Sequence, residues 1–208
     1  MSPLDQLIEQ FERFPGVGAR QARRFAFHVL SLPEADTETL ATTIQSLRHA
    51  VNKCTTCQRF FVHHTPSDVV CSICSDENRD TSTLLIVSAD TDITSIERSG
   101  TYSGLYFVLG GTIPLLSNTP GKRIRGNALK HLVEQSITNN SLEEIILGFP
   151  VNPDGENTAR YVEQLLKDTL SDTNVSLSVL GRGLSTGSEI EYADTETIKN
   201  ALQNRYTQ

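Results

Sequence analysis

Four cysteines constrain the fold of this chain more than any other feature. They are all the cysteines in 208 residues, and they form two C-x-x-C pairs within one stretch, CTTCQRFFVHHTPSDVVCSIC. Two tight knuckles of this kind can supply four thiolates to a tetrahedral Zn(II), and such a metal orders a segment that is too short to build its own apolar core. The predicted ligands of a structural zinc ion are Cys54, Cys57, Cys71 and Cys74.

Disulfides and a redox C-x-x-C are the alternatives to a zinc site. The polar start MSPLDQLIEQ contains no hydrophobic signal segment, so we expect a reducing cytoplasm, in which disulfides are rare. A redox C-x-x-C usually occurs singly, whereas here the pairs are doubled. Four thiolates close the coordination shell, so the predicted zinc is structural and not catalytic. His63 and His64 could in principle replace a ligand, although an exposed loop explains them more simply.

The composition limits the possible partners. The formal net charge of −7 gives no global attraction to nucleic acid or to acidic lipid, so any DNA binding must come from a local patch. The absence of Trp and an aromatic content of 6% argue against a protein that stacks single-stranded bases on aromatic platforms. No apolar run approaches the length of a membrane helix, so we expect no membrane partner.

Residues 5–31 predict two helices joined by a glycine turn. Apolar residues recur at helical spacing on both sides of the segment F-P-G-V-G (14–18). From residue 13 to residue 24 the chain contains four arginines and no acidic residue. The candidate DNA-binding residues are Arg13, Arg20, Arg23 and Arg24.

The glycine turn predicts a phosphate site. Gly16 and Gly18 allow a tight turn and bring bare N–H groups to the start of the second helix, where the helix dipole favours an anion. Arg20 and Arg24 are one turn apart and would flank that phosphate. Such binding touches the DNA backbone, so it is sequence-independent and strongly salt-dependent. A solvated basic face on an αα-hairpin stays open as the alternative, because a lone G-x-G is a weak signal.

A third helix is predicted at residues 36–53. We expect its apolar face to cover the two hairpin helices and to complete a small N-terminal core. The residues of this face are Leu40, Ile44, Leu47 and Val51.

Beyond the cysteines the pattern changes to alternating strands and helices. This alternation predicts a mainly parallel sheet with helices on both faces. The expected strands are the apolar runs at 84–87, 106–109, 145–147 and 175–180.

Together these patterns predict a multidomain α+β and α/β chain. The C-terminal part is polar and glycine-rich, and it could pack on its own domain or reach a neighbouring subunit. The expected parts are an N-terminal helix-hairpin-helix domain at 1–53, a zinc finger at 54–80 (the cysteine module), an α/β domain at 81–180 and a C-terminal segment at 181–208.

Several stretches can be compared with a known family. They are FPGVGARQARRFAFHVL (14–30), the C-x-x-C pair with its following C-S-I-C-x-D and R-D, I-E-R-S-G-x-Y-x-G-L-Y-x-V-L-G-G (96–111) and G-R-G-L-x-x-G-x-E-I-E-Y-A-D (181–194). In these stretches the chain resembles the RecR family of bacterial recombination mediators, over nearly its whole length. The last two stretches are long and particular to that family.

The resemblance implies a helix-hairpin-helix, a four-cysteine zinc finger, a Toprim domain and a C-terminal segment that helps assemble a ring. It implies homodimers or ring-shaped homotetramers that encircle duplex or gapped DNA without sequence specificity. It also implies work with RecO, and with RecF, to load RecA onto gapped DNA. The DNA contacts implied by the family fall on Arg20 and Arg24, and the zinc ligands on the four cysteines.

Catalytic Toprim domains place a Glu directly after the first strand and a D-x-D after a later one, so that carboxylates hold Mg(II). Here the first strand leads into Ser88, and the later strand leads into Gly148-Phe149-Pro150-Val151, which contains no acid. The nearby carboxylates do not have the required positions, so we expect no catalytic residues and no enzymatic activity. These carboxylates are Asp90, Asp92, Asp154 and Glu156.

The family often has Glu at the position of Ser88, and A-T-N-P-T where this chain has residues 148–152. Both departures indicate a divergent member and bear on partner contacts at this face, above all contacts with RecO. A second basic segment holds Lys122, Arg123 and Arg125, which could be a further DNA contact or a solvated loop.

The leading functional hypothesis is a non-enzymatic DNA-binding clamp in recombinational repair. One alternative is a Mg-dependent Toprim enzyme that cuts or joins DNA, which strand cleavage abolished by EDTA would indicate. Another is a protein-assembly scaffold, which duplex affinity insensitive to charge reversal at Arg20 and Arg24 would indicate.

Overall fold

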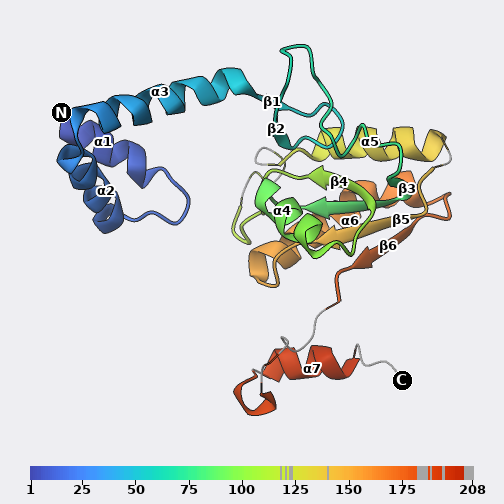
Figure 1. Ribbon diagram of the computed structural model, residues 1–208. Coiled ribbons are helices and arrows are strands. Elements are labelled where there is room, and N and C mark those ends of the chain that lie inside the picture. The colour runs from blue at the N-terminus through green and yellow to red at the C-terminus, as the bar shows by residue number, and fades with distance from the viewer. Residues whose placement is uncertain are drawn as a thin grey trace. The chain divides into compact units, whose positions relative to one another are not determined.

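The chain divides into two units, residues 1–52 and 53–208. The computed structural model (Figure 1) describes residues 1–117, 119, 121, 124–139, 141–181, 187, 189–193 and 195–203. Lys122 and Arg123 lie outside the described residues, as does the segment 182–186 of the C-terminal motif. Among the described residues, no helix has both the length and the apolar character needed to cross a bilayer.

The first unit contains the predicted helical hairpin. Helix α1 runs over Pro3–Glu12 and helix α2 over Ala19–Ser31. Ser2 begins α1 with a capping box, in which its side chain accepts from the Asp5 amide while the Asp5 carboxylate accepts from the Ser2 amide. Ala22 and Ala26 are fully buried on α2, which packs against α1. The small alanines let the two helices approach closely, so the opposite face of α2 is left for its charged residues.

Helix α3 spans Glu34–Ala50 and differs from the prediction in its packing. Leu40, Ile44 and Leu47 are 41%, 58% and 54% exposed. The predicted N-terminal core completed by this face is therefore wrong. The apolar spacing marked a face that this chain alone does not bury, because sequence periodicity does not say which surface will cover a helix.

The second unit is built on a four-stranded sheet whose order is β4-β3-β5-β6, with every neighbouring pair parallel. The parallel sheet predicted from the apolar runs is thereby confirmed. Its strands are β3 (Asp80–Val87), β4 (Gly104–Val108), β5 (Glu144–Gly148) and β6 (Ser176–Val179).

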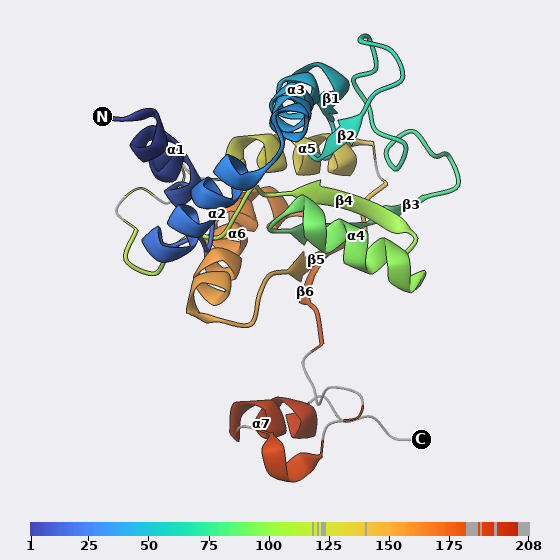
Figure 2. The ribbon, with the colours of Figure 1, turned by 60° about the vertical axis from the view of Figure 1, so that its left-hand side comes forward.

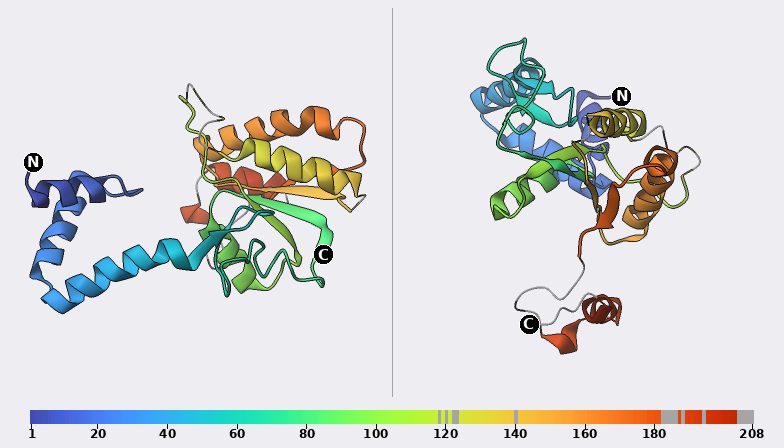
Figure 3. Two further views of the ribbon diagram at one scale, coloured as in Figure 1. Left: turned by 90° about the horizontal axis from the view of Figure 1, so that it is seen from above. Right: turned by 90° about the vertical axis from the view of Figure 1, so that its right-hand side faces the viewer.

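Helices cover both faces of this sheet (Figures 2 and 3). On one face lie α5 (Gly126–Thr138) and α6 (Pro153–Leu170), which pack against side chains such as Ile86 and Leu147. On the other face lie α4 (Asp90–Ser99) and the cysteine module, which share a second core with Leu85 and Tyr106. The cysteine module is therefore part of the α/β unit and not an independent appendage.

The cysteine module contributes little regular structure. Strand β1 (Val51–Lys53), directly before the module, pairs with β2 (Phe60–Val62) inside it, and a long loop leads from β2 to β3. Near the C-terminus are a 3₁₀ turn, η2 (Ile190–Tyr192), and helix α7 (Thr195–Gln203). Ile190 and Tyr192 are 65% and 79% exposed.

Candidate functional site

The four cysteines come together as the sequence predicted. One ligand atom from each lies within 4.8 Å of the others, and the Cys57 and Cys71 Sγ atoms are 3.6 Å apart. A tetrahedral Zn(II) with Zn–S bonds of about 2.3 Å separates its sulfurs by about 3.8 Å. Cys54, Cys57 and Cys71 are fully buried, and no cysteine is in a disulfide. The cluster is therefore a possible metal site with the donor set and spacing of a zinc finger.

Both knuckles have the same backbone turn. The Cys54 carbonyl accepts from the Gln58 amide, and the Cys71 carbonyl accepts from the Ser75 amide, each at 3.1 Å. The Cys71 amide points at the Cys54 Sγ at 3.4 Å, in the direction that favours a thiolate. Gln58 lies in the left-handed region with φ 64°, which is unusual for a residue with a side chain. The first knuckle is consequently tight and depends on contacts that hold it.

Hydrogen bonds among the thiols split their pKa values. They lower the pKa of Cys54. At Cys71 the hydrogen bond with Cys54 raises the pKa, but those with Cys57 and Cys74 together outweigh it and lower the pKa to about 6. The hydrogen bonds among the thiols raise the pKa of Cys57 and of Cys74, with burial contributing in the same direction. A divalent cation would neutralise the thiolates and displace the remaining protons.

The hairpin presents an open helix N-terminus. Gly16 has φ 75°, which a residue with a side chain rarely adopts, so glycine is needed for this turn. Gly18 is the N-cap of α2, and no side chain caps that end of the helix. Open space surrounds the place where a Cβ of Gly18 would lie. The first-turn amides can therefore approach an anion.

Three of the predicted DNA-binding arginines lie on the exposed part of α2. Arg20, Arg23 and Arg24 border a surface hollow of about 660 Å³ together with Phe27 and His28. Arg24 has a long hydrogen bond of 3.4 Å to the Gln21 side chain. In the described part of the chain, Arg20 and Arg23 have no hydrogen bond or ion pair.

Arg13 differs from the other three. It is the C-cap of α1, and its guanidinium pairs with Glu9 at 2.6 Å, one turn earlier on the same helix. Both side chains are well exposed, so this pair is weak in water. Arg13 nevertheless has an ion-pair partner, which Arg20 and Arg23 lack among the described residues, although Arg23 lies close enough to Asp5 for a Coulombic interaction.

The carboxylates near the carboxyl edge of the sheet serve as hydrogen-bond acceptors. Ser88, where a catalytic Toprim Glu would stand, is 8% exposed and donates to Asp92 at 2.7 Å. Asp92 also accepts from the Ala89 amide, and Asp90 accepts from the Phe60 amide at 2.7 Å. Asp154 accepts from the Leu115 amide at 3.0 Å. Among the described residues, the cysteines are the one group of three or more potential ligands gathered at metal-binding distance.

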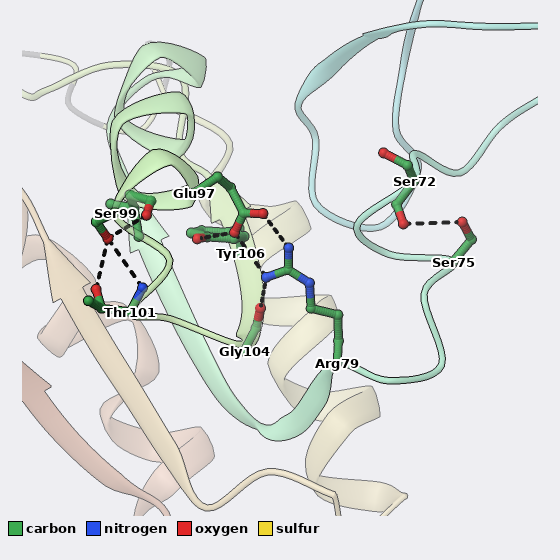
Figure 4. A network of polar contacts seen from close by, with 9 residues as sticks. Ser72, Ser75, Arg79, Glu97, Ser99, Thr101, Gly104 and Tyr106 are labelled. Carbon is green, nitrogen blue, oxygen red and sulfur yellow. Dashed lines mark hydrogen bonds and ion pairs between the residues drawn. The ribbon is translucent and has the colours of Figure 1, made fainter.

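A polar network joins the end of the cysteine module to the sheet (Figure 4). Arg79 forms a two-pronged ion pair with Glu97 of α4 and donates to the Gly104 carbonyl at 3.3 Å. Tyr106 donates to Glu97 at 2.6 Å, and the Arg79 guanidinium lies 5.9 Å from the centre of its ring. Hydrogen bonds from Arg79 lower the pKa of Glu97, and burial raises the pKa of Tyr106. Glu97 is thus held as a carboxylate.

No sequence pattern predicts a role for the residues of this network. Arg79, Glu97 and Tyr106 all fall within the stretches that carry the family resemblance, which was the available signal. Arg125 belongs to the second basic segment, which the sequence leaves open as a DNA contact. Its guanidinium donates to two backbone carbonyls of the protein, those of Gln58 and Val108. Charge alone does not distinguish an arginine that donates to protein carbonyls from the exposed arginines on α2.

Comparison with known proteins covers most of the chain. Residues 4–48 match the RecR helix-hairpin-helix, residues 82–181 match the Toprim domain and residues 183–206 match the RecR C-terminal region. The Recombination protein RecR of Gloeothece citriformis is 36% identical over 203 residues, which are 98% of this chain and 95% of the relative. This chain belongs to the RecR family.

Two further RecR relatives show that the similarity extends along the whole chain. The Recombination protein RecR of Lactobacillus helveticus is 34% identical, and that of Streptococcus mutans is 33% identical. In each case the alignment covers 98% of this chain and 96% of the relative. The RecR-family architecture predicted from the sequence, with helix-hairpin-helix, four-cysteine cluster and Toprim domain, is confirmed.

Proposed function

We propose that this RecR-family chain is a non-enzymatic DNA-binding clamp in recombinational repair. It binds duplex or gapped DNA without sequence specificity and acts in the cytoplasm. The observation that carries the proposal is the start of α2, where an uncapped helix N-terminus adjoins three exposed arginines. Amides at a helix start and guanidinium groups both bind phosphate, and neither reads a base.

The DNA contacts in this proposal are Arg20 and Arg24, assisted by Arg13 and Arg23. Arg20 and Arg24 lie one turn apart on the side of α2 opposite the buried Ala22 and Ala26. A phosphate at the helix start could therefore be approached by both guanidinium groups without disturbing the packing of α1 on α2.

A clamp requires more than one copy, and we propose a homodimer or a ring-shaped homotetramer. The apolar face of α3 supports self-association, because Leu40, Ile44 and Leu47 are exposed in the single chain. A ring could also place the arginines on its inner surface, so that a protein with a net charge of −7 still holds DNA. The proposed parts of the chain are the helix-hairpin-helix domain at 1–53, the zinc finger at 54–80, the Toprim domain at 81–180 and the C-terminal segment at 181–208.

The metal in this proposal is a structural zinc ion held by the four cysteines. It supplies no chemistry to a substrate, because four thiolates leave no open coordination position. Its contribution is to fix the two knuckles relative to each other. The buried thiols and the matched knuckle turns support this assignment.

We propose no catalytic residue in the Toprim domain. Asp90, Asp92 and Asp154 each accept a hydrogen bond from a backbone amide, and Ser88 adds no carboxylate. A magnesium site would require these acceptors to be released and brought together. The acids of this edge therefore organise loops.

By its family, we propose that the clamp works with RecO, and with RecF, to promote RecA loading on gapped DNA. The carboxyl edge of the sheet differs from the usual RecR pattern at Ser88 and at residues 148–152. Binding of RecO to this chain therefore depends on contacts adapted to that edge.

The test is binding to a labelled gapped duplex by the full chain and by the variant Arg20→Glu/Arg24→Glu. We expect the affinity to fall about ten-fold or more, because phosphate contacts are lost and repulsion is added. The matched control is Arg160→Glu/Lys167→Glu on α6, which changes the net charge equally at exposed positions. Equal affinity of the hairpin variant and the wild type would contradict the clamp and favour a protein-assembly scaffold.

The same labelled gapped duplex can be used to test for cleavage or joining of DNA strands by the protein. Incubation with Mg²⁺ should leave every strand intact. Cleavage or joining that disappears with EDTA would overturn the non-enzymatic assignment and indicate Toprim-type chemistry.

A further inference from the structure

The first cysteine knuckle is fastened to the Toprim domain by hydrogen bonds from three places. The Cys57 carbonyl accepts from the Val108 amide of β4 at 2.8 Å. The Gln58 carbonyl accepts from the Arg125 Nη1 at 2.6 Å. The Phe60 amide donates to the Asp90 Oδ1 at 2.7 Å. Residues on both sides of the strained Gln58 are therefore held by groups outside the cysteine module.

Arg125 is itself fixed on several sides. Its amide donates to the Leu109 carbonyl at 2.8 Å, and its Nη1 also donates to the Val108 carbonyl at 3.1 Å. Its guanidinium lies 5.7 Å from the centre of the Phe60 ring. Gly110, with φ 95°, leaves room for it, since a Cβ there would lie 3.2 Å from the Arg125 Nε. The side chain is thus preorganised to receive the Gln58 carbonyl.

The geometry points to Arg125 and Asp90 as positioning residues for the metal site. We define the Arg125 and Asp90 contacts with residues 58–60 as the knuckle latch. The latch holds the first knuckle in its ligating shape before the metal arrives, so it raises zinc affinity by lowering the cost of ordering the knuckle. Because linkage is reciprocal, bound zinc in turn stabilises the latch. This inference rests on the proposed zinc site.

The latch also gives Asp90 a role at the edge where a catalytic Toprim domain would gather its acids. Asp90 stands at the start of α4 and Arg125 directly precedes α5. Both helix starts would flank the phosphates of a substrate in a catalytic α/β domain. In this chain they carry side chains that hold a neighbouring metal knuckle.

The first experiment measures the zinc affinity of the full-length protein by competition with a chelating dye. Arg125→Gln and Asp90→Ala should each weaken zinc affinity, Arg125→Gln by about ten-fold, as outer-shell changes do at other metal sites. Arg125→Lys and Asp90→Asn should recover part of the loss, because each keeps a donor or an acceptor. The exposed controls Arg98→Gln and Asp172→Asn should match the wild type.

Two further readouts separate positioning from general stability. The Co(II)-substituted protein reports thiolate coordination through its absorption bands, which should shift in Arg125→Gln and return toward the wild type in Arg125→Lys. The wild type must first show stoichiometric zinc and a tetrahedral cobalt spectrum, and failure of that step would refute the zinc site itself. Wild-type zinc affinity in Arg125→Gln and Asp90→Ala would refute the latch alone.

Hydrogen exchange tests the latch without any substitution. Removal of zinc from the wild type should expose the amides of Phe60 and Val108 to exchange, because each forms a hydrogen bond between the first knuckle and the Toprim domain, that of Phe60 within the latch and that of Val108 beside it. The neighbouring Leu109 amide, which donates to the Val87 carbonyl within the sheet, is the matched control and should stay protected. Persistent protection at Val108 and Phe60, or equal loss at all three amides, would overturn the proposed coupling.

Discussion

In the helical hairpin, Arg20 and Arg23 are exposed and have no hydrogen bond or ion pair within the described residues, whereas Arg79 and Arg125 of the second unit each bridge two protein groups. Arg79 joins a carboxylate to a strand carbonyl, and Arg125 joins a knuckle carbonyl to a strand carbonyl. Arginine side chains thus differ within this chain: some are exposed without hydrogen-bond partners, and others link parts of the fold. The number of protein groups that each guanidinium contacts distinguishes the two kinds.

The two regions also differ in how they treat backbone groups. The start of α2 leaves its amides without a capping side chain, next to open space at Gly18. At the first knuckle, the carbonyls of Cys57 and Gln58 and the amide of Phe60 are paired with the Toprim domain. Unpaired polar groups are costly when buried but useful at a surface that receives a ligand. The exposed groups of the hairpin fit the proposed binding of phosphate, whereas the paired groups of the first knuckle have a structural role.

The largest expected effect comes from removing a cysteine. Cys57→Ser should abolish stoichiometric zinc binding, because metal binding contributes about 10 kcal/mol or more at structural zinc sites. The sheet should persist, since β3, β4 and β5 are buried in a core shared with α5 and α6. Zinc content by elemental analysis and circular dichroism check both parts.

Wild-type zinc content in Cys57→Ser would contradict this expectation. Full loss of ordered structure would contradict it in another way, because it would make the sheet depend on the metal. The first result would show that the knuckle does not need Cys57 to bind zinc. The second would show that the sheet is not stable without the metal.

A smaller effect is expected from the Arg79 network. Arg79→Ala should lower the free energy of unfolding by about 1 to 2 kcal/mol, since it leaves the Glu97 carboxylate, whose side chain is 32% exposed, without its charged donor. Urea denaturation monitored by circular dichroism measures this. Affinity for DNA at saturating zinc should stay unchanged, because Arg79 is satisfied within the protein.

The pH dependence of this pair has a defined sign. The pKa of Glu97 lies below its ordinary value of 4.5 because Arg79 donates to it, so the ionised pair stabilises the fold above pH 4.5. That contribution disappears as the pH falls through the lowered pKa. The stability difference between the wild type and Glu97→Gln should therefore shrink below pH 4.5, and a constant difference down to pH 2 would contradict the pairing.

The smallest effect is expected at Arg13. Its pair with Glu9 is exposed and worth about 0.3 to 0.5 kcal/mol to α1. Arg13→Gln should weaken binding to gapped duplex less than Arg20→Gln does, because Glu9 already competes for the Arg13 guanidinium. Fluorescence titration of labelled DNA with both variants measures the two affinities. A larger loss of affinity for Arg13→Gln than for Arg20→Gln would show that an ion pair within the protein does not reduce the contribution of an arginine to DNA binding.

Much of the fold followed from local patterns in the sequence. The C-x-x-C spacing predicted the cysteine cluster, and the apolar runs predicted the strands, because both signals depend on residues close together in the chain. The face of α3 was misassigned, because Leu40, Ile44 and Leu47 have the spacing of a buried face but no cover within one chain.

The knuckle latch could not be predicted in the same way. Arg125 meets Gln58 across 67 positions of sequence, and Asp90 meets Phe60 across 30. Neither contact produces a periodic pattern in the sequence. On the knuckle side the partners are the Gln58 carbonyl and the Phe60 amide, which are backbone groups and therefore not visible in the residue type. Only the folded sheet brings the starts of α4 and α5 to the cysteine module.

The most direct test of the comparison is the salt dependence of DNA binding for single arginine variants, measured at saturating zinc. Arg20→Gln and Arg24→Gln should each flatten the slope of log affinity against log salt by about 0.9, the value for one lost phosphate contact. Arg79→Gln and Arg125→Gln should leave the slope at its wild-type value. A flattened slope in the latter pair, or an unchanged slope in the former, would contradict the account.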